Sequence, residues 1–157
     1  MNTAILSKHD LLNHWLEHRN LTRRTLEKFP EDHLFTFKVD QMRTFADLIK
    51  ELLSLAVPGL HGIVHHESKP YDHDLPYTNK EELLKAWDEA TPQIEKLFLQ
   101  IPEERFADDY NLFGQYNFPI IHNILYFIDN EIHHRGQGFV YLRLLGIEPP
   151  FFWDRSK

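Results

Sequence analysis

The sequence contains no cysteine, and this absence excludes several kinds of chemistry at once. Disulfide bonds, a cysteine nucleophile and thiolate metal ligands are all impossible, so any thiol reaction needs a thiol from another molecule. Because disulfides are rare in the cytosol, a chain without cysteine suits that compartment. We therefore expect a cytoplasmic location.

Long apolar runs and basic clusters are also missing. Nowhere do about 18 apolar residues follow one another, and the start MNTAILSKHD has no basic segment before an apolar one, so neither a membrane span nor a targeting signal is expected. Lys and Arg total 17 against 24 Asp and Glu, which gives a net charge of -7. An acidic chain repels phosphate, so a nucleic-acid partner is disfavoured.

What the chain has in quantity is apolar residues and histidine. Its 157 residues, 42% of them hydrophobic, predict a single domain over residues 1–157 with a substantial core. Eleven histidines are conspicuous, because each is a potential metal ligand or proton carrier.

Apolar residues recur at helical spacing in four segments. Three of these segments follow a hydroxyl residue placed three positions before an acid, beginning at Ser7, Thr44 and Thr78, which is the pattern of a helix-capping box. Pro58 should kink or stop the second helix, although helical character can resume through residue 63, and Pro92 should bend the third. The expected helices span residues 8–28, 45–56, 80–101 and 119–145.

Two long connections join these helices. Residues 61–77 are rich in His and Pro, and residues 102–117 carry aromatic residues that suit a short extended or hairpin segment. Four helices with long crossovers predict an all-α four-helix bundle. The last helix is apolar on most sides, so it should lie at the centre of the bundle or be shared with a second subunit in a homodimer.

Three residues stand out as candidate site residues. Asn130 and His134 are four residues apart, so they lie one above the other on one helix face, where two donors can share a metal. Such a pair can equally be structural or exposed. Glu51 lies on or beside an apolar stripe, where it is either buried with a partner or a metal, or at the edge of the stripe in contact with water.

Longer motifs carry a family resemblance. Residues 133–137 read His-His-Arg-Gly-Gln, and residues 141–150 read Tyr-Leu-Arg-Leu-Leu-Gly-Ile-Glu-Pro-Pro. Together they resemble the last-helix signature of the DinB/YfiT-like metalloenzyme superfamily, and residues 43–51 and 79–87 are similar to its second and third helices. The resemblance implies a bundle with up-down-down-up connectivity and a bacterial stress-response setting.

The resemblance also implies a metal centre. Many members of this superfamily hold a divalent metal with three histidines, one from the second helix and two from the fourth, and some transfer thiols such as bacillithiol onto electrophiles. The chain is therefore expected to be a divalent-metal-dependent enzyme, a thiol S-transferase or a hydrolase, whose partner is a small-molecule substrate or a low-molecular-weight thiol. Zinc, nickel, iron and manganese are the candidate cofactors.

The chain departs from the superfamily at two of the three metal ligands. By resemblance the triad reads Glu51, Asn130 and His134, with one carboxylate, one amide and one imidazole. This set binds a divalent metal more weakly than three imidazoles do. In the alternative, metal binding is lost and Glu51 pairs with His134, which lowers the pKa of the carboxyl group. The protein is then a catalytically inactive, metal-free dimeric bundle that binds a small ligand or another protein.

The remaining polar residues of the motifs have more modest expected roles. His133 should point about 100° away from His134. Arg135 and Gln137 should contact a carboxylate or a backbone carbonyl, and Gly136 should allow close approach of another helix. His18 is expected to be a partner of the metal ligands or a core histidine.

Residues in the two connections and at the end of the chain complete the predictions. His61 or His65 could supply a replacement donor if the first connection, a solvated loop, folds over the site. The aromatic residues between Phe106 and Phe118, and those at 151–153, are expected to cover the end of the bundle.

Overall fold

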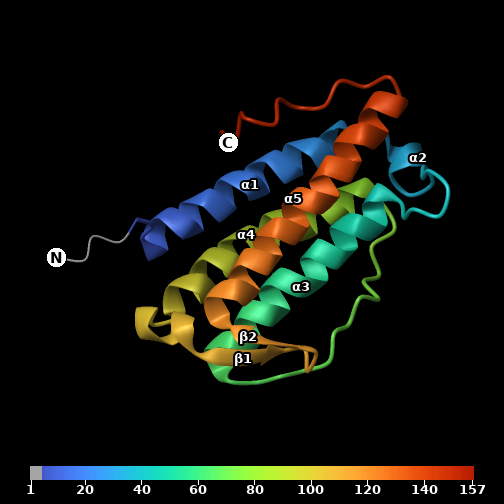
Figure 1. The fold of residues 1–157 in the computed structure, drawn as a ribbon. Coiled ribbons are helices and arrows are strands. Elements are labelled where there is room, and N and C mark those ends of the chain that lie inside the picture. Colours follow the sequence, from blue (N-terminus) through green and yellow to red (C-terminus); the bar gives the residue numbers. More distant parts are fainter. Residues whose placement is uncertain (1–4) are drawn as a thin grey trace.

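In the computed structural model, which describes residues 5–157, four long helices lie side by side (Figure 1). Short elements connect them: one further helical turn, one 3₁₀ turn and a two-stranded hairpin. The elements in order are α1 (Lys8–Lys28), α2 (Glu31–Leu34), α3 (Phe45–His65), α4 (Lys80–Gln100), η1 (Glu103–Ala107), β1 (Asp109–Leu112), β2 (Tyr116–Pro119) and α5 (Ile120–Leu144).

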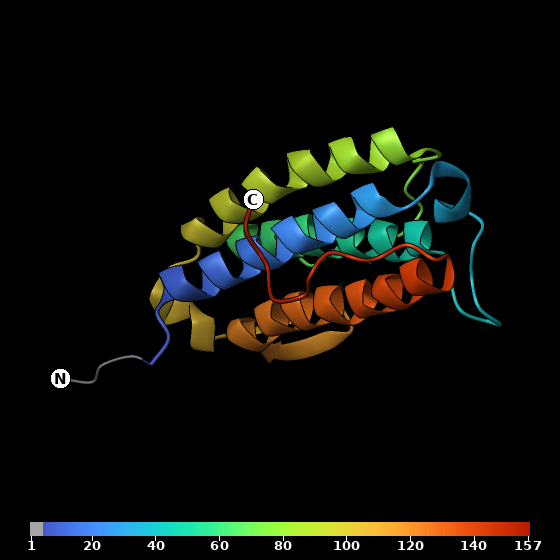
Figure 2. The same cartoon turned by 90° about the horizontal axis from the view of Figure 1, so that it is seen from above.

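The long helices confirm the all-α bundle and its up-down-down-up connectivity. Helices α1 and α5 run in one direction and α3 and α4 in the other, as two perpendicular views show (Figures 1 and 2). Each long helix packs against two others: α1 contacts α4 and α5, and α3 contacts the same two. Because α3 and α4 run parallel, the chain must return along the whole bundle between them, and residues 66–79 make this crossover.

The helices begin much as the capping patterns predict. The Ser7 side chain accepts from the Asp10 N–H in a complete capping box, and Thr44 accepts from the Asp47 N–H. The third helix begins at residue 80 as expected, but the Asn79 side chain, not that of Thr78, caps α4. The carbonyl oxygen of the Asn79 amide accepts from the Glu82 N–H at 2.9 Å.

Helix α3 continues past Pro58 to His65, so the expected stop after residue 56 is wrong and the resumption is confirmed. A proline inside a helix removes one backbone hydrogen bond, and packing of the flanking turns can offset that loss. Here the flanking turn packs closely at Gly59, where the Phe127 ring of α5 occupies the space that a side-chain carbon would need. The absence of a side chain lets the two helices approach closely.

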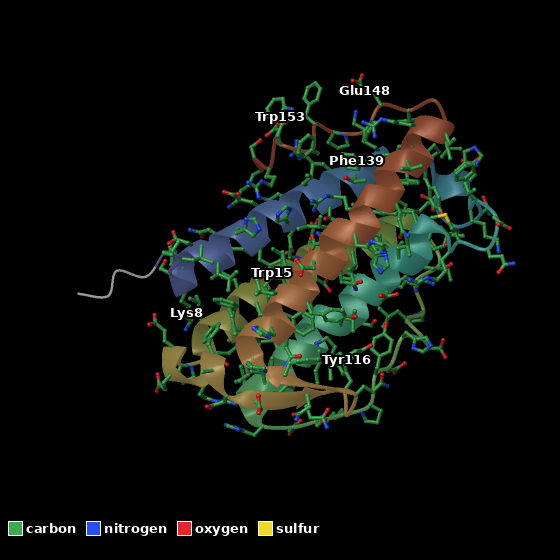
Figure 3. The ribbon with its side chains drawn as sticks, in the orientation of Figure 1. Lys8, Trp15, Tyr116, Phe139, Glu148 and Trp153 are labelled. Atoms are coloured by element: carbon green, nitrogen blue, oxygen red, sulfur yellow. The ribbon has the colours of Figure 1, made fainter. Side chains whose placement is uncertain are left out.

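The aromatic connection contains the expected extended segment. Strands β1 and β2 pair antiparallel, with Leu112 opposite Tyr116, and the turn between them places Phe113 and Gly114 at positive φ. Leu112 and Phe113 are buried, so the hairpin covers one end of the bundle. Phe151, Phe152 and Trp153 do not cover the bundle: they are 59%, 72% and 66% exposed, and Trp153 lies on the C-terminal segment outside the helices (Figure 3).

Two hydrophobic clusters fill the bundle, one toward each end. One contains Trp15, Leu55 and Ile128, and the other contains Leu26, Leu52 and Tyr141. Helical spacing predicts one buried face for the first helix, and all of its members are buried: Leu11, Trp15, His18, Thr22, Leu26 and Phe29. Between the clusters lies a set of polar residues, here called the polar layer: His18, Arg19, Thr22, Glu51, Asn130, Glu131, His134 and Arg135.

The solvent-facing side of helix α5 carries exposed apolar residues among the exposed polar residues Asp129, His133 and Arg143. Leu125, Ile132, Val140 and Leu144 are between 37% and 60% exposed. Gly136 on the same helix has open space around it, so no helix of the described chain approaches it as the sequence predicted. The close approach is made two residues later, where Gly138 packs against Phe45. In the described residues no helix is both long and apolar enough to cross a membrane.

Candidate functional site

The three residues of the expected triad meet in the polar layer between α3 and α5. His134 Nε2 lies 2.9 Å from Glu51 Oε1, and the Asn130 amide donates to the same oxygen at 3.2 Å. Asn130 and His134 share one face of α5 because four residues make about one helical turn. The structure therefore brings together residues that are 79 and 83 positions apart in sequence.

The Glu51 carboxylate is held by three partners. Besides His134 and Asn130, the guanidinium of Arg43 binds its second oxygen, and the side chain is 19% exposed. Hydrogen bonding to His134, helped by Arg43 and Asn130, outweighs the opposing effect of burial and lowers the pKa of Glu51 to about 2. Glu51 is therefore a charged, partnered carboxylate at the edge of the core.

Both ring nitrogens of His134 face oxygen atoms. Nε2 faces Glu51, and Nδ1 lies 3.0 Å from Oε1 of Gln137. A neutral imidazole has a single N–H and can donate to one oxygen only. With its N–H on Nε2, the ring can donate to Glu51 and accept at Nδ1 from the Gln137 amide, whose NH₂ and oxygen exchange places when the amide is flipped. Neither nitrogen is free to contact a substrate.

The donors present fit a three-ligand metal site poorly. Asn130 turns its NH₂ group toward Glu51, whereas a metal would need its oxygen. Arg43 brings its own positive charge to Glu51. Within residues 5–157 no group of three or more His, Asp or Glu side chains has the geometry to hold a metal ion. Two donors, Glu51 and His134, remain correctly placed side by side.

A polar cleft of about 380 Å³ opens beside Glu51. Helix α3 forms one wall and the crossover the other. Tyr71 of the crossover is tied to α3 by a 2.9 Å hydrogen bond between its hydroxyl and that of Ser54, and burial raises the pKa of Tyr71. The cleft is lined by Arg43, Asp47, Lys50, Glu51, Tyr71, His73, Asp74 and Leu75.

Apart from His73, which lines the cleft, none of the histidines that the sequence singled out beyond the triad contributes to this site. His61 and His65 belong to α3 and not to a loop. The prediction that one of them replaces a lost metal ligand is wrong, because ten residues of helix place His61 about 15 Å from Glu51. His133 is exposed, as predicted. Gln137 contacts His134 and not a carboxylate or a carbonyl.

The ion pair of Arg19 and Glu131, in the half of the polar layer that faces α1, was not predicted from the sequence. Glu131 is 2% exposed, accepts from the Thr22 hydroxyl at 2.6 Å and lies 3.8 Å from Arg19. The signal for it was a carboxylate three and four residues after Ile128 and Phe127, on the buried side of α5. Arg135 donates to the backbone carbonyl of His18 at 3.1 Å, which confirms the carbonyl contact expected of it.

His18 is a core histidine, because it contacts Arg135 and none of the expected metal ligands. Its Nδ1 lies 2.9 Å from the Arg135 guanidinium, and its Nε2 lies 3.2 Å from that of Arg155. Burial, together with the charge of Arg135, lowers the pKa of His18 to about 3. The half of the layer at α1 thus holds α1 and α5 together and contains no open site.

Fold and site together define a helical-bundle protein with a carboxylate–imidazole site between its second and last long helices. The DinB family model matches residues 1–155, and the chain belongs to the DinB family. An uncharacterised protein of Bacillus subtilis strain 168, YjoA, is 27% identical over 150 residues, which cover 92% of this chain and 96% of YjoA.

Two solved structures share the fold. A DinB-like protein from Bacillus cereus ATCC 10987 has a TM-score of 0.76 at 15% identity, over 92% of this chain and 97% of that one. The structure of YjoA from Bacillus subtilis has a TM-score of 0.70 at 23% identity, over 90% of this chain and 96% of that one. At these identities the likeness concerns the fold alone.

Proposed function

We propose that this DinB-family protein binds a small polar molecule in the cleft beside Glu51, and that a proton shared by Glu51 and His134 takes the place of a metal. The observation that carries the proposal is the arrangement around His134, where both ring nitrogens already contact oxygen. A histidine with no free nitrogen cannot act as a general base, because it has no atom that reaches the substrate. The arrangement supports binding rather than catalysis.

The cleft defines the class of ligand. Arg43 and Lys50 supply positive charge, Asp47 and Asp74 negative charge, and Tyr71 a hydroxyl group. Such a lining suits a small molecule that carries both carboxylate and amine groups. A low-molecular-weight thiol of that kind remains a candidate, and its sulfur must come from the ligand because the chain has no cysteine.

A second candidate is the divalent-metal-dependent enzyme, a thiol S-transferase or a hydrolase. One observation favours it: Glu51 Oε1 and His134 Nε2 are 2.9 Å apart, which is about the separation of two adjacent ligands around a divalent cation. Glu51 and His134 would hold the cation, with Asn130 joining only after its amide rotates. A bound metal would lower the pKa of a thiol or of water.

Metal analysis separates the two candidates. The untagged protein is incubated with zinc, nickel, iron(II) or manganese, desalted and measured by inductively coupled plasma mass spectrometry. We expect far less than one equivalent in the wild type, and a gain in the Glu51→His, Asn130→His double variant, which restores three imidazoles and serves as the positive control. Near-stoichiometric metal in the wild type that disappears in His134→Ala would overturn the first proposal in favour of the second.

The proposal includes a homodimer and a cytoplasmic location. The exposed apolar residues of α5, with open space at Gly136, support a second copy packing there. Sedimentation should show a dimer at micromolar concentration that Val140→Glu dissociates. Leu99→Glu, on an exposed apolar residue of α4, is the matched control and should leave the dimer intact. A monomeric wild type would contradict this part.

A further inference from the structure

A second pocket, of about 360 Å³, lies beyond the polar cleft, where the last turns of α3, the crossover and the hairpin meet (Figure 1). Helix α3 contributes Val57 and Pro58, the crossover contributes Pro70 and Asp72, and the hairpin contributes Phe113. Its walls are mainly apolar. Tyr71, between Pro70 and Asp72 in sequence, lines the polar cleft instead, so this residue separates the two cavities.

The pocket is held open by fixed elements. The Tyr110 hydroxyl of β1 donates to the backbone carbonyl of Glu67, and the Ser68 hydroxyl donates to the carbonyl of Asn111 at 2.9 Å. These two bonds join the crossover to the hairpin. Tyr71 is bonded to Ser54 at 2.9 Å, which joins the crossover to α3. All three walls are therefore connected by hydrogen bonds outside the pocket's apolar surface.

The charge at the rim is unbalanced. Glu67 is paired with Lys69 at 3.0 Å. Asp72 has no basic side chain within ion-pair distance in residues 5–157; its Oδ1 accepts from the backbone N–H of Asp74 at 3.1 Å. One carboxylate beside an apolar cavity therefore remains available to a cation.

We propose that this pocket is a binding site for a small aromatic amine. The ring lies against Val57, Pro58 and Phe113, and the ammonium group donates to the Asp72 carboxylate. An aromatic ring buries a large apolar area at low conformational cost, and a cation matches the single unpaired carboxylate. The site is separate from the Glu51–His134 pair and does not depend on the function proposed for that pair.

Phenethylamine is the probe, with 2-phenylethanol and phenylacetate as matched compounds that carry a neutral and a negative group. Titrations of the full-length protein are followed in ¹H–¹⁵N spectra. We expect shifts at residues 54–62, 67–72 and 110–113, in the order amine, then alcohol, then acid. No shifts at millimolar amine, or equal binding of phenylacetate, would overturn the proposal.

Two pairs of variants test the residues. Asp72→Asn keeps the acceptor for the Asp74 N–H and should weaken amine binding roughly fivefold, the effect of one partly exposed ion pair. Asp74, two residues later in the sequence, lines the polar cleft, so Asp74→Asn should leave amine binding unchanged. Val57→Trp fills the pocket and should abolish binding of all three compounds, whereas Leu99→Trp on α4 should not. Equal effects of Asp72→Asn and Asp74→Asn would mean that general charge, and not this pocket, attracts the amine.

Discussion

Replacement of Glu51 by glutamine should destabilise the protein at neutral pH, and the loss should be about half as large near pH 3. The pKa of Glu51 falls from its ordinary value of 4.5 to about 2 in the folded protein. This difference corresponds to roughly 3 kcal/mol of folding free energy at neutral pH. Solvent screening of a side chain that is 19% exposed reduces the effect to about 2 kcal/mol.

The pH dependence follows from the direction of the shift. A carboxylate whose pKa is lower in the folded state stabilises the fold fully above the unfolded value of 4.5. As the pH falls toward about 2, the folded state takes up the proton and the contribution is lost. Glutamine has no charge to lose, so the difference between the two proteins should shrink over this range.

Urea unfolding at pH 7, 5, 4 and 3 measures the difference directly. The free energies of unfolding of wild type and Glu51→Gln should differ by about 2 kcal/mol at pH 7 and by about 1 kcal/mol at pH 3. Glu95→Gln, at an exposed carboxylate of α4, is the control and should show little difference at any pH. A difference that stays constant from pH 7 to pH 3 would refute the assignment of the charge.

Other changes probe the polar layer and the close contacts of α5. Glu131→Gln leaves the 1%-exposed guanidinium of Arg19 without its carboxylate, so urea unfolding should show a loss of about 3 kcal/mol, and a loss below 1 kcal/mol would contradict the ion pair. Gly138→Ala places a carbon against the ring of Phe45 and should lower the stability by about 1–3 kcal/mol. Gly136→Ala meets open space and should raise the monomer's stability by up to about 1 kcal/mol. Thermal melts compare the two glycine variants, and a Gly138→Ala protein more stable than Gly136→Ala would show that the packing of α5 is misassigned.

Much of the bundle is predictable from local patterns. Apolar residues at helical spacing identify the buried face of α1, and hydroxyl and acidic residues mark where α1 and α3 begin. These features depend on neighbours within one or two helical turns. The end of α3 could not be predicted in the same way, because the loss at Pro58 is offset by contact between Gly59 and Phe127, which is far away in sequence.

The candidate site was likewise predicted from the sequence only in part. Resemblance to a known helix signature located Glu51, Asn130 and His134, but their mutual contacts depend on the packing of α3 against α5. The ion pair of Arg19 and Glu131 had no local signal beyond a charge among apolar residues. A residue type indicates what a side chain can do, whereas its partner is set by helices that meet only after folding.

The sequence by itself determined the class of fold, the absence of any cysteine chemistry and the residues at the family's ligand positions. Only the tertiary structure decided that Asn130 turns its NH₂ toward Glu51, that Arg43 binds the second carboxylate oxygen and that both nitrogens of His134 are engaged. The physical reason is that helix formation depends on interactions a few residues apart. Hydrogen-bond partners and pKa values depend instead on which charges and which solvent the packed helices leave within a few ångströms.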